Sequence, residues 1–177
     1  MTKWPAAAAR RTSSASVTDR RSAYLDALHL LARRELSVSE VRARLIDKEH
    51  PADEIEAAIA HLLETGGLDD ARVARAYART AVSIKGRGRL RVQRELNEKG
   101  ISRDVAAAAV AEVFGDADER SMVAKAIQKR LRGRTTVKDR AESVRLYQHL
   151  MRQGFTPAAV MAALRKVRGG SISIDDE

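Results

Sequence analysis

Two runs of basic side chains are the strongest candidates for chemistry in this sequence. The first has five bases and no acid within ten residues: Lys85, Arg87, Arg89, Arg91 and Arg94. The second has six bases and one acid within twelve residues, and begins with Lys129, Arg130, Arg132 and Arg134. Cationic side chains neutralise phosphate groups without any base-specific contact. We expect these nine residues to form a basic stripe that binds nucleic acid; the alternative is a solvated face with a basic linker.

Residues for catalysis or metal binding do not gather in any recognisable spacing. There is no cysteine, and the four histidines are scattered, which matches no zinc-ligand pattern. Acidic pairs such as Asp69-Asp70 fall at expected helix starts, where the helix dipole favours negative charge. Gly86-Arg87-Gly88 follows no strand, so it does not predict a Walker-type phosphate loop. We therefore expect no enzyme activity, no metal and no cofactor.

Composition and charge limit the fold classes and the kinds of partner that this sequence allows. Of 177 residues, 3% are aromatic, which disfavours an all-β fold and a large aromatic-lined pocket. No stretch approaches the roughly 20 apolar residues of a membrane span. The net charge of +9 favours a polyanionic partner. Residues 22–69 carry five bases and ten acids, whereas residues 116–170 carry thirteen bases and five acids. We expect a cytoplasmic, all-α protein with separate acidic and basic regions.

Apolar residues recur at the spacing of one helix face in nine segments, which predicts nine helices. These helices must position the basic residues. Ser37 with Glu40 predicts a capping box, and Asp116 with Glu119 predicts another helix start. The expected core faces are Tyr24-Leu28-Leu31, Val38-Val41-Leu45, Ile55-Ile59-Leu62-Leu63, Val73-Ala76-Tyr77-Ile84, Val92-Leu96, Val105-Ala109-Val113, Val123-Ile127-Leu131, Val144-Tyr147-Leu150-Met151 and Val160-Leu164-Val167.

Sharp corners between helices recur along the chain. Gly100 and Gly154 each follow a helical run and precede an apolar residue and a Ser or Thr. A left-handed glycine, an apolar contact and an N-cap are the elements of a Schellman corner. The equivalent segment near residue 49 has Glu49-His50 instead of a glycine and an apolar residue, so we expect that corner to be built differently.

The recurring corners predict three tandem three-helix units. We place them at residues 22–68 (acidic), 69–115 (basic) and 116–168 (basic). Stacked units of this size form an elongated, curved array. Residues 1–21 are expected to be a disordered basic arm and residues 169–177 a flexible acidic tail. No apolar stripe is left over, so we expect a monomer.

Several segments resemble the RecX family of regulatory proteins. They are Leu30–Ser37 followed by Glu40–Leu45, then Gly67–Ala74 with Tyr77, then Lys85–Gly88 followed by Arg94–Leu96 and Lys99–Ile101. Residues 116–168 match more loosely, through Tyr147, Leu150, Gly154-Phe155 and Val160. Arg89 departs from the pattern, which has a proline after the second glycine of this segment.

The resemblance implies a three-repeat, nine-helix modulator of the RecA recombinase, with a role in homologous recombination, DNA repair and the SOS response. Such proteins lie in the helical groove of the RecA–DNA filament. They limit filament extension and suppress ATP hydrolysis and strand exchange, without catalytic activity of their own. The implied partners are the RecA filament and DNA, single-stranded and also double-stranded. The basic stripe would then contact the filament.

Two other interpretations stay open at this point. Three-helix units with sharp turns also occur in stand-alone DNA-binding proteins of the transcription-regulator type. However, the segment Ala106–Ala109 offers few polar side chains that could read bases. The other interpretation is an adaptor for proteins alone, whose basic charge serves solubility.

Overall fold

The computed structural model describes residues 22–114 and 116–168, which form nine helices and no strand. The helices are α1 (Ala23–Leu31), α2 (Val38–Ile46), α3 (Ala52–Glu64), α4 (Asp70–Ser83), α5 (Arg89–Glu98), α6 (Arg103–Val113), α7 (Asp116–Leu131), α8 (Arg140–Gln153) and α9 (Pro157–Arg168). None of them is long and apolar enough to span a bilayer. The arm and tail expected at residues 1–21 and 169–177 lie outside the described residues.

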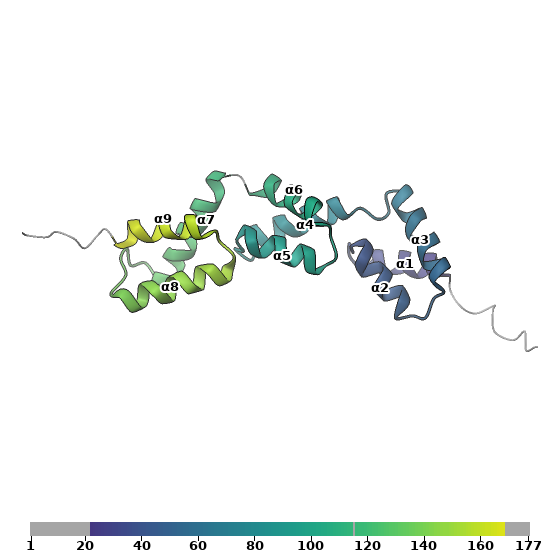
Figure 1. The fold of residues 1–177 in the computed structure, drawn as a ribbon, viewed down its shortest axis with the longest axis horizontal. Coiled ribbons are helices and arrows are strands. Elements are labelled where there is room, and N and C mark those ends of the chain that lie inside the picture. Colours follow the sequence, from purple (N-terminus) through teal and green to yellow (C-terminus); the bar gives the residue numbers. More distant parts are fainter. Residues whose placement is uncertain (1–21, 115, 169–177) are drawn as a thin grey trace, which may run out of the picture.

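The helices follow one another as three groups in an elongated row, α1–α3, α4–α6 and α7–α9 (Figure 1). Each group has its own hydrophobic core, and the extensive helix contacts fall within a group. Met122 packs against both the second and the third core. The expected all-α array of three-helix repeats is confirmed, while the exact unit boundaries stay a prediction.

The three corners share one backbone geometry. Ile101 N–H donates to the Leu96 carbonyl at 3.2 Å, with Gly100 at φ +75°. His50 N–H donates to the Leu45 carbonyl at the same distance, with Glu49 at φ +60°. The expectation of a different first corner is therefore wrong for the backbone. A glutamate accepts the left-handed conformation there, at a cost of about 1–2 kcal/mol.

The first corner differs in its side chains. His50 is buried where the other corners have Ile101 and Phe155. Its Nε2 lies 3.0 Å from Oδ2 of Asp26, and Lys48 lies 3.0 Å from the other carboxylate oxygen. These partners hold the pKa of the buried Asp26 below its ordinary value, Lys48 first. A polar cluster thus fills the space that an apolar residue fills elsewhere.

Some helices bury a different face from the one expected. In α1 the buried residues are Ala23, Asp26 and Ala27, whereas Leu28 is 39% exposed. Small side chains let α1 pack closely on α3, and the Asp26 carboxylate is satisfied by hydrogen bonds. In α8, Leu146 is buried, but Val144 lies on an exposed face. Ile84, expected in the core of the second unit, is 79% exposed.

Consecutive groups meet through the ends of their second helices. The Ser37 hydroxyl, at the start of α2, donates to the Lys99 carbonyl at the end of α5 at 2.6 Å. Gly88 N–H, at the start of α5, donates to the Gln153 carbonyl at the end of α8 at 2.8 Å. The same type of joint therefore connects both pairs of neighbouring groups, as expected for a repeat.

Candidate nucleic-acid interface

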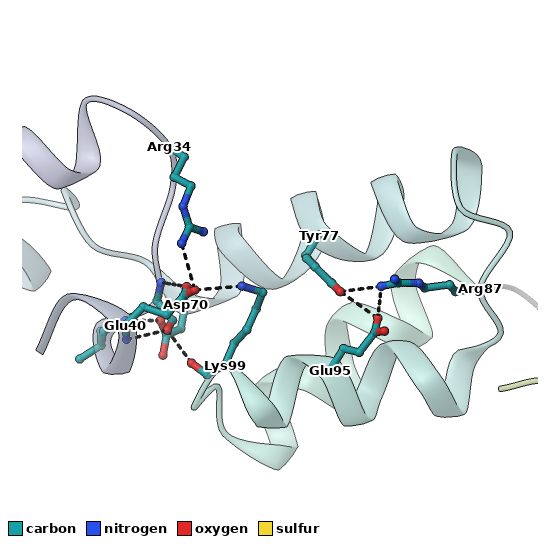
Figure 2. A network of polar contacts seen from close by, with 9 residues as sticks. Arg34, Glu40, Asp70, Tyr77, Arg87, Glu95 and Lys99 are labelled. Carbon is teal, nitrogen blue, oxygen red and sulfur yellow. Dashed lines mark hydrogen bonds and ion pairs between the residues drawn. The ribbon is translucent and has the colours of Figure 1, made fainter. Parts of the chain in front are cut away.

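Two of the predicted basic residues take part in a polar network within the second unit. Arg87 forms an ion pair with Glu95 and donates to the Tyr77 hydroxyl at 2.9 Å (Figure 2). Tyr77 in turn donates to Glu95 at 2.8 Å, and Arg91 donates to the other oxygen of Glu95 at 3.0 Å. This carboxylate therefore occupies both arginines.

The network also sets the protonation of its members. Burial opposes ionisation of Glu95, but hydrogen bonds from Arg91 and Tyr77 and the charge of Arg87 outweigh it, and its pKa lies below the ordinary value. Burial, together with the neighbouring Glu95, raises the pKa of Tyr77. Glu95 is thus charged and Tyr77 neutral at physiological pH, which makes the network a stable internal support.

Figure 2 shows that a second polar cluster lies at the joint with the first unit. Lys99 Nζ lies 3.0 Å from Glu40, which also accepts from Arg34. Val38 N–H donates to the Asp70 carboxylate at 2.9 Å. Lys99 further lies 5.5 Å from the centre of the Tyr77 ring. Charged residues of the second unit therefore hold the first unit in place.

Three more of the predicted bases have partners on the protein itself. Arg89 donates to the Phe114 carbonyl at 3.0 Å and lies 3.8 Å from the buried carboxylate of Glu119. Arg134 binds Glu142 through both guanidinium nitrogens, and this hydrogen bonding lowers the pKa of Glu142 to about 2. Arg94 lies 3.5 Å from Glu98, with both side chains largely exposed. Such an exposed pair is weak, so Arg94 can exchange partners readily.

The other four predicted bases converge on one hollow between the second and third units. We call this the inter-unit hollow; its volume is about 680 Å³. Its basic lining residues are Lys85, Lys125, Lys129, Arg130 and Arg132, from the turn after α4 and from α7 and its following turn. The lining residues include no acid, and none of these five bases has an ion pair among the described residues. Their charge is therefore available to an external anion.

The inter-unit hollow also has apolar and titratable lining. Val82, Ile84, Met122 and Ala126 contribute apolar surface. His149 lines it as well, and its pKa is lowered by partial burial and by the charges of Arg130 and Arg152. Cations beside an apolar surface can take a phosphate chain whose apolar groups lie against Ile84.

The sequence reasoning missed Lys125, His149 and Ile84. Lys125 could have been found, because it precedes Lys129 by four residues and Arg132 by seven, which is one face of a helix. Ile84 was assigned to the core by its spacing. Nothing in the sequence indicates that α8 brings His149 to the same place. Among the described residues, no three His, Asp or Glu side chains gather closely enough to hold a metal ion.

Comparison with known proteins identifies the relatives of this chain. Residues 23–62 match the family model "RecX, first three-helix domain", and residues 69–110 match "RecX, second three-helix domain". The regulatory protein RecX of Halorhodospira halophila is 36% identical over 138 residues, covering 77% of this chain and 83% of that protein. The regulatory protein RecX of Vibrio parahaemolyticus is 33% identical, covering 78% and 86%.

Solved structures agree with the fold. The crystal structure of RecX from Lactobacillus salivarius has a TM-score of 0.71 with 21% identity, covering 82% of this chain and 94% of that chain. A second crystal structure of a regulatory protein RecX also gives 0.71, with 22% identity and coverage of 80% and 70%. With two matched domains and relatives aligned over most of their length, this chain belongs to the RecX family of regulatory proteins.

Proposed function

We propose that this chain is a negative modulator of RecA that binds in the groove of the RecA–DNA filament and inhibits filament extension, ATP hydrolysis and strand exchange. Family membership supports a regulatory role. An elongated row of helical units can follow a long groove better than a compact protein can. The observation that carries the nucleic-acid part is the inter-unit hollow, where five bases face solvent with no acid among the lining residues.

The charge distribution suggests an orientation on the filament. The basic second and third units would approach DNA phosphates, while the acidic first unit would face basic surface on RecA. This mode of action needs no catalysis and no cofactor from the chain. We further propose that the chain acts as a monomer in the cytoplasm. Within the filament it contacts single-stranded and also double-stranded DNA.

The first test is the single-stranded-DNA-dependent ATPase activity of RecA, titrated with this protein. We expect inhibition at ratios well below one protein per RecA monomer, since one bound protein can block extension of a whole filament. The matched comparison uses two charge-reversal variants of equal net charge. Lys129→Glu/Arg132→Glu alters the inter-unit hollow, and Arg33→Glu/Arg44→Glu alters exposed bases of the first unit.

The outcomes separate the proposal from its rivals. Unchanged ATPase activity at equimolar protein, with RecA and DNA behaving normally, would overturn the proposed function. Inhibition that both variants retain equally would keep RecA regulation and reject the hollow as the contact. A tight, sequence-selective shift of duplex DNA without RecA would favour a stand-alone DNA-binding protein instead.

A further inference from the structure

The third unit has a second hollow, between α7 and α9, which the proposed function does not use. Its volume is about 600 Å³, and we call it the α7/α9 hollow. Ile127 and Leu131 of the core form part of its lining, and Ala159, Ala163 and Val167 of α9 are only partly covered. Contact between an apolar hollow of this size and water is unfavourable, so covering the hollow stabilises the protein.

The same hollow has a cationic lining. Arg120 and Lys166 line it and are exposed, and neither has an ion pair among the described residues. Arg134 also lines it, but Glu142 already binds that side chain. No acid is among the lining residues. The occupant that fits is therefore a short segment with apolar side chains and negative charge.

The chain itself continues with such a segment directly beside the hollow. Lys166 and Val167 are lining residues, and α9 ends at Arg168. The next nine residues in the sequence are Gly-Gly-Ser-Ile-Ser-Ile-Asp-Asp-Glu, with two apolar residues, three acids and no base. Gly169-Gly170 has the backbone freedom that a reversal of direction requires.

The geometry of the third unit gives the segment a direction. Glu119, at the start of α7, accepts hydrogen bonds from the backbone and hydroxyl of Thr156, just before α9, at 3.0 and 3.1 Å. The starts of α7 and α9 are thus held together, so Arg120 lies at the end of the hollow away from Val167. The path along α9 from Val167 back to Ala159 is about 12 Å. Seven extended residues reach about 23 Å, which is enough.

We propose that residues 169–177 fold back into the α7/α9 hollow of the same chain. Ile172 and Ile174 cover the apolar lining, and the carboxylates of residues 175–177 lie near Arg120. In an extended segment, side chains two residues apart point to the same side. Both isoleucines can therefore face the helices at once. The segment covers apolar surface of the third unit and neutralises one of its cations. This inference is independent of RecA.

The test is methyl NMR spectroscopy on the full chain. We expect nuclear Overhauser effects between the methyl groups of Ile172 or Ile174 and those of Ile127 or Ala163. Ile172→Ser/Ile174→Ser should shift the Ile127 and Ala163 resonances, whereas the control Ile84→Ser, at an exposed isoleucine elsewhere, should leave them unchanged. The charge contact is tested by Arg120→Glu, which should shift the same resonances, and by Asp176→Arg in that background, which should restore them.

Two results would overturn the proposal. One is the absence of these Overhauser effects together with unchanged Ile127 and Ala163 resonances in Ile172→Ser/Ile174→Ser. The other is a set of effects that vanishes on dilution while sedimentation shows a dimer, because the hollow would then hold the segment of a second copy. Effects that persist on dilution of a monomer support docking within one chain.

Discussion

The backbone N–H of Gly88 donates to the carbonyl of Gln153 at 2.8 Å, which joins the start of α5 to the end of α8. Leu90 N–H donates to the Gly154 carbonyl at 3.0 Å beside it. A Cβ on Gly88 would lie 2.3 Å from the Gly154 carbonyl carbon, whereas the φ of Gly88 is an ordinary −78°. The glycine is needed there because two backbones approach closely.

We therefore predict that Gly88→Ala destabilises the joint between the second and third units. Overpacking of backbone against backbone should lower the free energy of unfolding by about 2 kcal/mol. Gly86→Ala is the comparison: its φ is +59°, but a Cβ would meet no atom within 4 Å, so the cost should be about 1 kcal/mol. Urea denaturation measures both, and an equal loss in the two variants would contradict the steric explanation.

Glu49→Gly should stabilise the protein. Glutamate at φ +60° costs about 1–2 kcal/mol, and glycine removes that strain while it adds about 0.5–1 kcal/mol of unfolded-state entropy. The net gain is expected to be about 0.5 kcal/mol. Asp47→Gly, two residues earlier at an ordinary φ of −59°, should destabilise. Thermal unfolding of the two variants measures the difference, and a lower melting temperature for Glu49→Gly would contradict the strain.

Acid should weaken the network around Glu95. Its pKa is lowered in the folded protein, so its contribution to stability is present above the ordinary glutamate pKa and is lost as the pH falls through the folded value. We therefore expect the free energy of unfolding to decline as the pH falls below the ordinary glutamate pKa of 4.5. Glu95→Gln should be less stable at pH 7 and show a smaller decline. Urea titrations at several pH values measure this, and parallel pH curves would refute it.

The Arg87→Glu variant should unfold more readily, and its main defect should be in stability rather than in nucleic-acid binding. The substitution removes the partner of a mostly buried carboxylate and places a second negative charge beside it, at an expected cost of about 3 kcal/mol. Arg94→Glu, at an exposed base of the same helix, should cost less than about 1 kcal/mol. Equal melting temperatures for both variants would show that the Arg87 network contributes little.

Reversal of charge in the inter-unit hollow should weaken nucleic-acid binding without loss of stability. Lys129→Glu/Arg132→Glu alters two exposed bases that have no ion pair among the described residues. If each base contacts one phosphate of a single strand, the slope of log affinity against log salt should become shallower by about 1.4. Fluorescence anisotropy with labelled single-stranded DNA measures the slope. The slope should stay unchanged in Arg33→Glu/Arg44→Glu, and an equal change there would indicate a purely global charge effect.

The sequence by itself determined the local structure of this protein. The capping box of Ser37 and Glu40 is present as predicted, and Gly100 and Gly154 adopt the left-handed conformation at their corners. Caps and glycine corners depend on residues within a few positions of one another, so their spacing is visible in the chain. The resemblance to the RecX family rested on such segments, and the comparisons confirm it.

Only the tertiary structure decided which bases are available. Arg89 and Glu119 are thirty residues apart in the sequence, yet they form an ion pair across two units. Lys85 and Lys129 are separated further still, yet they line one hollow. A basic run indicates positive charge, but it does not show whether a distant carboxylate neutralises that charge. Helix packing brings such partners together, and it also exposes Ile84 while burying Ala74, Ala78 and Ala81 of α4.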